Sequence, residues 1–216
     1  MLDFENVCFS YDKKTVLENF TFSIEEGKTT AILGPSGFGK TTVLELAARF
    51  LKPQSGKISL PCSKKASFVF QEDRLLPWAT AIENMTAVNI KKDAAMEYLE
   101  KVGLAADAEK YPDELSGGMQ RRLAIARSLA FGGEIFFLDE PLRGLDIKTS
   151  AEIIELIRTE LSGKTVLMVT HSPAEAFFLS DRIIVAGKNP LEILADRKKS
   201  DFSCEAELSD FLKKII

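Results

Sequence analysis

The sequence is poor in the residues that form disulfides and metal sites. It has three cysteines among 216 residues, Cys8, Cys62 and Cys204, and a single histidine. The cysteines are odd in number and widely separated, so neither a disulfide framework nor a Cys-x-x-Cys metal or redox site is expected. We interpret them as packing residues or surface thiols.

Long apolar runs and an excess of basic residues are also missing. The most apolar stretches, 135–138 and 166–169, are far shorter than the ~20 residues that cross a bilayer. Lys and Arg number 28 against 32 Asp and Glu, a net charge of -4, which argues against nucleic acid as a partner and requires any anion site to be built locally. Residues 1–5 are acidic where a secretory signal is basic, so we expect a cytosolic chain that serves a membrane only through a partner.

Short apolar segments alternate with helical patterns along the chain, which predicts an α/β fold with a parallel sheet covered on both faces. The first sixty residues are rich in β-patterns. The expected strands are 7–11, 20–24, 30–33, 57–60, 66–70, 135–138, 165–169 and 182–186. The expected helical stretches are 42–51, 80–127 with a break near Pro112, 119–130, 149–161, 174–179 and 205–216.

A glycine-rich loop lies between the expected strand 30–33 and the helix that follows it. It matches the pattern G-x-x-x-x-G-K-[ST], and we take Thr42 directly after it as part of the same candidate nucleotide site. The loop consists of Gly34, Pro35, Ser36, Gly37, Phe38, Gly39, Lys40 and Thr41. The alternative, a glycine-rich turn that matches by chance, is disfavoured by the strand and helix on either side.

The chemistry of this loop suits a polyphosphate. Glycines let successive backbone N–H groups turn inward at the positive end of a helix, where phosphate charge is favoured. Lys40 can then reach the β- and γ-phosphates, and the Thr41 hydroxyl is placed to ligate Mg²⁺. The loop therefore predicts binding of ATP with Mg²⁺.

Two carboxylates follow the apolar strand 135–138, at the end of the strand where parallel sheets place ligands. We expect Asp139 to hold Mg²⁺ through water and Glu140 to act as the general base for the attacking water. An acidic turn after a strand is commonplace and most often structural, so this interpretation depends on the phosphate loop.

A second glycine pair opens another expected helix, within the run Leu-Ser-Gly-Gly-Met-Gln at 115–120. Chemically this is a second anion site, which one nucleotide in one chain does not need. The run resembles the LSGGQ signature of ABC transporter ATPases. In that family two subunits associate head to tail, so the resemblance implies that Ser116, Gly117 and Gly118 contact the γ-phosphate of ATP held by the partner. Ser116 can equally serve as a helix N-cap.

Further positions match the family in order. Tyr11 stands where an aromatic ring stacks on adenine, Gln71 resembles the glutamine that senses Mg²⁺ and γ-phosphate, and His171 resembles the switch histidine. Asp146 ends the Gly-Leu-Asp run of the loop that crosses the dimer interface. For Tyr11 packing alone, and for His171 a structural or solvated role, are the alternatives.

The resemblance covers essentially the whole chain and implies one ABC ATPase domain, 1–216. It implies an α/β P-loop NTPase (RecA-like) core, roughly 1–70 and 128–216, with an N-terminal antiparallel β subdomain and an inserted helical subdomain, roughly 71–127. The implied partners are a second, identical ATPase subunit, transmembrane permease subunits and an extracytoplasmic solute-binding protein. The implied place is the cytoplasmic face of the cell membrane.

The sequence departs from the family at two points. Phe38 stands where a small residue is common, and Leu142-Arg143-Gly144 replaces a more familiar run before the Leu-Asp pair at 145–146. Arg143 places a cation near the implied dimer interface, where it can pair with a carboxylate of the partner or remain solvated.

The run Gln-Glu-Asp-Arg-Leu-Leu-Pro-Trp at 71–78, with Ile-Glu-Asn at 82–84, is similar to importers of nitrate, sulfonate, taurine and bicarbonate, a branch that includes relatives handling thiamine precursors. Trp78 and residues 75–77 are apolar groups near the expected permease surface, and the alternative for Trp78 is burial in the helical subdomain. Because an ATPase subunit does not touch the transported solute, the cargo rests on analogy.

Other functions stay open at this point. An ABC exporter or a lipoprotein-release ATPase carries the same motifs. A soluble ABC ATPase of DNA repair would need a long heptad coiled coil, and one of translation usually has two cassettes; the sequence shows neither. A module that binds ATP without hydrolysing it is disfavoured by the presence of Gln71, Glu140 and His171.

Overall fold

The computed structural model describes residues 2–60 and 65–215, so Cys62 lies outside the described residues. The thiol of Cys8 is free and partly buried, and that of Cys204 is free and exposed. Among the described helices, none is long and apolar enough to cross a membrane.

An antiparallel sheet forms the N-terminal part of the molecule. Its strand order is β2-β1-β4, with β1 Leu2–Tyr11, β2 Lys14–Ile24 and β4 Ser55–Ser59. Alternate residues of β1 and β2 turn inward, and the rings of Phe4, Phe20 and Phe22 pack on one another there. The predicted N-terminal antiparallel sheet is confirmed.

A six-stranded sheet forms the centre, in the order β5-β6-β7-β3-β8-β9. Its strands are β3 Thr29–Leu33, β5 Ala66–Val69, β6 Ile135–Asp139, β7 Thr165–Thr170, β8 Arg182–Gly187 and β9 Glu192–Lys198. The first five in spatial order pair in parallel, but β9 runs antiparallel to β8. The predicted parallel sheet is confirmed for these five strands, and the antiparallel edge strand β9 was not among the expected strands.

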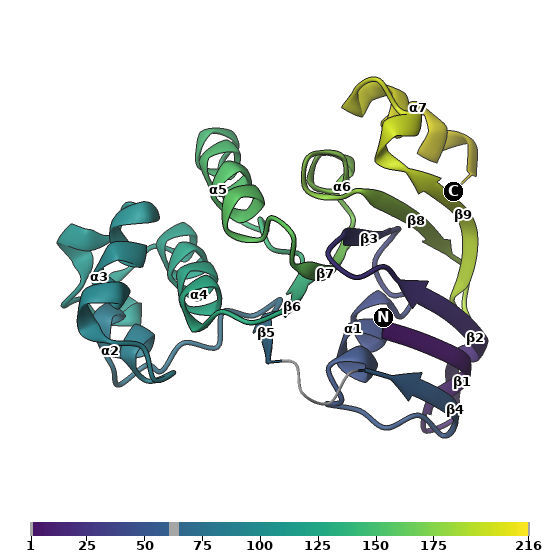
Figure 1. The fold of residues 1–216 in the computed structure, drawn as a ribbon, viewed down its shortest axis with the longest axis horizontal. Coiled ribbons are helices and arrows are strands. Elements are labelled where there is room, and N and C mark those ends of the chain that lie inside the picture. The colour runs from purple at the N-terminus through teal and green to yellow at the C-terminus, as the bar shows by residue number, and fades with distance from the viewer. Residues whose placement is uncertain (1, 61–64, 216) are drawn as a thin grey trace.

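Each face of the central sheet carries its own apolar core, because neighbouring residues of a strand point to opposite faces. Ile32 and Phe137 pack with helix α1 (Lys40–Ala47) and the N-terminal sheet. Leu33 and Phe136 pack on the other side with the remaining helices. Figure 1 shows α1 lying between the two sheets, and α5 and α6 on the opposite side of the central sheet.

The segment between β5 and β6 is helical and lies at the end of the molecule away from the N-terminal sheet (Figure 1). It contains α2 Ala81–Thr86, α3 Lys92–Lys101 and α4 Gly117–Phe131. The expected division near 127/128 falls inside the continuous helix α4, and the subdomain boundaries stay a prediction.

Three helices follow β6: α5 Ile147–Glu160, α6 Pro173–Leu179 and α7 Glu205–Ile215. The amphipathic α7 buries Leu208 and Leu212. Short 3-10 turns occupy Ala105–Asp107, Pro112–Glu114 and Lys199–Asp201.

Candidate functional site

The loop from β3 to α1 depends on glycine for its shape. Gly37 and Gly39 have φ angles of 86° and 88°, a left-handed conformation that other residues adopt at a cost. A Cβ atom on Gly39 would lie 2.4 Å from Cγ1 of Val16 in β2. Gly34 is held even more tightly, since a Cβ there would lie 2.1 Å from the carbonyl oxygen of Ala186 in β8. The β-strands on both sides therefore fix the path of this loop.

Lys40 begins α1 as a buried cation, with 6% of its surface exposed. Its Nζ donates a hydrogen bond to the carbonyl oxygen of Pro35 at 2.7 Å. Burial lowers the pKa of Lys40, and the nearby carboxylates of Glu140 and Asp139 oppose that shift. Within residues 2–60 and 65–215 Lys40 forms no direct ion pair, and a buried ammonium of this kind at the start of a helix suits an anion such as a phosphate group.

The end of β6 brings Asp139 against the first turn of α1. The Thr41 hydroxyl donates to Oδ1 of Asp139 at 3.3 Å. Burial raises the pKa of Asp139 to about 6, while the Thr41 hydroxyl acts in the opposite direction. A desolvated carboxylate beside a hydroxyl is a donor pair of the kind that Mg²⁺ prefers.

Glu140 continues from Asp139 in a strained conformation. Its φ angle is 45°, which is uncommon for a residue other than glycine, and its backbone N–H donates to the carbonyl oxygen of Val169 at 2.9 Å. Oε1 of Glu140 lies 2.9 Å from Nδ1 of His171. The turn thus sends the side chain toward the end of β7 rather than along β6.

Most of the predicted nucleotide residues line one cavity of about 270 Å³. The predicted residues that line it are Tyr11, Ser36, Gly37, Gly39, Lys40, Thr41, Thr42, Gln71, Asp139 and Glu140. Gly34 and Pro35 instead line a separate hollow with His171, and Phe38 lines neither. Lys14 and Val16 of β2 also line this cavity; neither was predicted, because neither belongs to a sequence motif.

Tyr11 lies at the end of β1 with 45% of its surface exposed. Its hydroxyl donates to Oε2 of Glu45 at 3.3 Å, and its ring meets Phe9 edge-on with centroids 4.9 Å apart. The ring is therefore held in place at the mouth of the cavity, and adenine stacking stays a prediction.

The second predicted anion site is separate from the cavity. Ser116 is exposed and caps α4, its Oγ accepting the backbone N–H of Met119 at 3.3 Å. Asp146 is exposed and caps α5, its Oδ1 accepting the N–H of Thr149 at 3.0 Å. A Cβ on Gly118 would lie 3.7 Å from Cδ2 of Leu145, so the start of α4 adjoins the loop before α5. None of Ser116, Gly117, Gly118 and Asp146 is among the residues that line the cavity.

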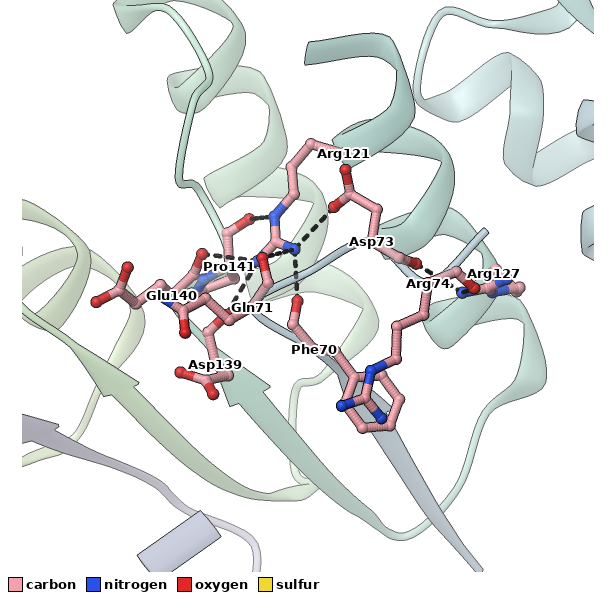
Figure 2. A network of polar contacts seen from close by, with 9 residues as sticks. All are labelled: Phe70, Gln71, Asp73, Arg74, Arg121, Arg127, Asp139, Glu140 and Pro141. Carbon is pink, nitrogen blue, oxygen red and sulfur yellow. Dashed lines mark hydrogen bonds and ion pairs between the residues drawn. The ribbon is translucent and has the colours of Figure 1, made fainter. Parts of the chain in front are cut away.

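Arg121 of α4, the helix that Ser116 caps, contacts the end of β6 beside the cavity, and it was not predicted from the sequence. Figure 2 shows its guanidinium between the end of β6 and the segment that begins at Phe70. The signal was present, because Arg121 shares a helical face with the buried Ile125 and Leu129. A charged residue on an apolar face calls for a buried partner.

The comparisons with known proteins agree with this geometry. A family model described as ABC transporter matches residues 17–143. The chain belongs to the ABC transporter family. As an ABC ATPase it is similar to a dimeric structure of the bacterial ABC transporter cassette MJ0796, with 32% identity, a TM-score of 0.83, and coverage of 92% of this chain and 99% of that one. A post-hydrolysis state of the same cassette bound to ADP and Pi gives a TM-score of 0.81 at 31% identity, covering 92% and 99% of the two chains.

Curated relatives of this ABC ATPase are import subunits. It is 34% identical to the aliphatic sulfonates import ATP-binding protein SsuB 1 of Shouchella clausii (strain KSM-K16), over 100% of this chain and 91% of the relative. It is 39% identical to SsuB of Bacillus thuringiensis subsp. konkukian (strain 97-27), over 82% and 76%. It is 35% identical to the spermidine/putrescine import ATP-binding protein PotA of Mycoplasma mycoides subsp. mycoides SC (strain CCUG 32753 / NCTC 10114 / PG1), over 89% of this chain and 60% of that protein.

These findings confirm the predicted family, the P-loop NTPase fold and the activity, so the chain is an ATP-hydrolysing subunit of the ABC transporter family. The roles of individual residues stay predictions. The structure places Trp78 on the surface, with 74% of the residue exposed. The alternative that placed Trp78 in the core of the helical segment was wrong.

Proposed function

We propose that this ABC ATPase powers import of a small organic anion of the sulfonate type through a separate permease, from the cytoplasmic face of the membrane. The observation that carries the catalytic part is the convergence of Lys40, Asp139 and Glu140 on one cavity. The sulfonate assignment is supported by the relatives that are named for aliphatic sulfonate import.

The cavity residues divide the work of ATP binding. The N–H groups of the glycine loop and the ammonium of Lys40 would hold the phosphates. In residues 2–60 and 65–215 no group of three or more His, Cys, Asp or Glu side chains is placed to hold a metal. Mg²⁺ would therefore take few protein oxygens, those of Thr41, Gln71 and Asp139, and complete its shell with phosphate and water. Bound there, Mg²⁺ would supply charge neutralisation at the phosphates.

Glu140 would be the general base. One of its carboxylate oxygens, Oε1, contacts His171, which leaves Oε2 to accept a proton from the attacking water. His171 is more than half exposed at its side chain, so it can contact a bound γ-phosphate while it orients Glu140. Proton acceptance and phosphate contact would thus be linked through one hydrogen bond.

The second half of the site would come from an identical subunit. Ser116, Gly117 and Gly118 lie apart from the cavity of their own chain, as a head-to-tail dimer requires. Binding of ATP between the two half-sites would favour the closed dimer, and hydrolysis would release it.

The exposed Trp78 is proposed to contact the permease, because a large exposed apolar side chain in the segment that follows Gln71 could transmit closure of the dimer. An extracytoplasmic solute-binding protein would deliver the cargo on the other side of the membrane. A second cargo class, polyamines, is also to be tested, because the polyamine-import relative is nearly as similar in sequence to this chain as the sulfonate-import relatives.

Transport in vesicles tests this proposal. The chain would be reconstituted with the permease and solute-binding protein encoded beside it, and ATP-dependent uptake of a labelled aliphatic sulfonate would be compared with uptake of labelled spermidine. We expect sulfonate uptake that is lost with Glu140→Gln, and lost with Trp78→Ser while ATP hydrolysis by the free chain continues. Uptake of spermidine alone would overturn the anion assignment, and ATP-dependent export would overturn the direction.

A further inference from the structure

Arg121 occupies the second turn of α4 with 2% of its surface exposed. A guanidinium keeps its charge in a protein, so burial at this depth is costly unless every donor is satisfied. Its neighbours on the same face, Ile125 and Leu129, are buried and apolar, and they do not compensate the charge. The partners must come from outside α4.

Three of these partners are consecutive carbonyl oxygens at the end of β6. Nη2 donates to Asp139 at 3.0 Å and to Glu140 at 2.7 Å, and Nε donates to Pro141 at 2.8 Å. These three carbonyls define the turn in which Glu140 has its strained φ angle of 45°. Arg121 therefore holds the backbone of the proposed general base in that turn.

The remaining donors reach the segment that carries Gln71. Nη1 donates to the carbonyl oxygen of Phe70 at 2.6 Å and to Oδ1 of Asp73 at 3.0 Å (Figure 2). All five N–H donors of the guanidinium thus have partners, and Asp73 supplies the negative charge. One rigid planar group spans both segments at once, which a lysine ammonium cannot do.

Two other arginines of α4 show that this bridge is specific. Arg122 points away from the site and donates to the carbonyl oxygen of Val102 at 2.6 Å. Arg127 donates to the carbonyl oxygens of Asp73 at 2.9 Å and Arg74 at 3.0 Å, so it holds the Gln71 segment, and among the described residues it makes no hydrogen bond to β6. The comparison leaves Arg121 as the arginine of α4 that contacts both segments.

We infer that Arg121 is a positioning residue for hydrolysis, which locks the Glu140 turn and the Gln71 segment to the helix that begins with Ser116. This inference rests on the proposed roles of Glu140 and Gln71. Through Arg121, a displacement of α4 on dimer closure moves the general base and the Mg²⁺-sensing glutamine together. Loss of the bridge should slow the chemical step and leave nucleotide affinity largely intact, because none of the hydrogen bonds of Arg121 to the described residues goes to the phosphate loop.

The test compares Arg121→Lys with Arg122→Lys, its neighbour on the same helix. For each variant of the full chain, kcat and KM for ATP hydrolysis, the affinity for a fluorescent ATP analogue and the melting temperature would be measured. We expect Arg121→Lys to lower kcat by about 10-fold to 100-fold with KM changed less than about 3-fold, in the range of a lost positioning contact. Arg122→Lys should keep kcat, whatever its melting temperature.

Equal kcat values for the two variants would overturn the inference, as would a loss of nucleotide affinity in Arg121→Lys as large as its loss of kcat. If Arg121→Lys does not unfold cooperatively, Asp73→Asn takes its place, since it removes the anionic partner and keeps the carbonyl contacts. A several-fold lower kcat at unchanged KM supports the inference, and an unchanged kcat overturns it. A parallel measurement on Glu140→Gln distinguishes failure of the proposed site from failure of the Arg121 inference. If Glu140→Gln hydrolyses ATP at the wild-type rate, the proposed site is refuted. If Glu140→Gln is inactive and Arg121→Lys has the wild-type kcat, only the Arg121 inference is refuted.

Discussion

Nδ1 of His171 lies 2.9 Å from Oε1 of Glu140, although the two residues are 31 positions apart in the chain. They meet because β6 and β7 are neighbouring parallel strands that end at the same edge of the sheet. Glu140 is buried with 8% of its surface exposed, whereas the His171 side chain is 55% exposed. The pair therefore links an enclosed carboxylate to a side chain that a ligand or a second subunit can reach.

Glu140→Gln keeps the shape of this pair but removes the proton acceptor. We expect ATP binding to persist and kcat to fall by at least about 100-fold, the size of a lost general base. Slow hydrolysis should trap an ATP-dependent dimer, visible by gel filtration with and without Mg-ATP, and phosphate release would give the rate. His171→Ala should also bind ATP, and its kcat should fall less than that of Glu140→Gln, because the Glu140 carboxylate remains. A Glu140→Gln protein that hydrolyses ATP normally, or stays monomeric with it, contradicts the assignment.

Gly39→Ala tests how far the N-terminal sheet shapes the phosphate loop. The new Cβ would meet Cγ1 of Val16 at 2.4 Å in a residue whose φ is 88°. The matched control is Gly37→Ala, which has nearly the same φ of 86° but no atom within 4 Å of the new Cβ. Both should lose about 1–2 kcal/mol of unfolding free energy from backbone strain, and Gly39→Ala a further ~1–3 kcal/mol from overpacking.

Urea unfolding without nucleotide measures that difference. Adding Val16→Ala to Gly39→Ala should restore part of the overpacking loss, because it removes the atom that the new Cβ would meet. The same addition to Gly37→Ala should not. Equal losses in the two single variants would show that the strand does not constrain the loop.

The sequence patterns located the parallel strands and most helices because those segments are apolar and periodic. Strand β9 was missed, since of its seven residues only Ala195 is buried and its place is set by backbone pairing to β8. The helix at 42–51 was predicted to reach residue 51 because the apolar pattern continues past Arg49. In the structure α1 ends at Ala47, and the φ angle of Arg49 is 62°, which is not helical.

The site was predictable where each residue belongs to a motif of fixed spacing, as with Lys40 and Asp139. The burial of Arg121 could have been predicted from its apolar helical face, but its role could not, because most of its partners are carbonyl oxygens from two distant segments and backbone groups leave no mark in a sequence. The exposure of Trp78 was equally open, since an apolar residue in a loop can face either way.

Glu175 should make the stability of the nucleotide-free protein depend on pH. Burial raises its pKa; the Thr170 hydroxyl and His171 oppose the shift, and Glu140 adds to it. One carboxylate oxygen, Oε2, has no hydrogen-bond partner. Because the folded state holds this proton more tightly than the unfolded state, its contribution to stability is present below pH 4.5 and is lost as pH rises through the raised pKa.

Glu175→Gln should therefore be more stable than the wild type at pH 8, by roughly 1 kcal/mol, with little gain at pH 4. Urea unfolding at pH 4, 6 and 8 measures this. Glu207→Gln is a control in which the stability should change in the opposite direction. Hydrogen bonds from Ser203 lower the pKa of Glu207, so removal of this carboxylate should reduce stability at pH 8. A Glu175→Gln protein that is less stable than the wild type at pH 8 would show that the buried charge is compensated.

Ser116→Asp separates the two roles assigned to Ser116. Asp caps a helix as well as Ser does, and its charge is favourable at the start of α4, so the melting temperature should hold or rise. The same charge would face the γ-phosphate of ATP held by the partner subunit, so ATP-driven dimerisation should weaken by more than about 10-fold, the effect of ~1.4 kcal/mol of repulsion. Ser116→Asn is the matched control, since it caps α4 without a charge and should dimerise. Both changes would be made in the Glu140→Gln background and followed by analytical ultracentrifugation with Mg-ATP. If the Asp and Asn variants dimerise equally, Ser116 serves only as a cap and the second half of the nucleotide site lies elsewhere.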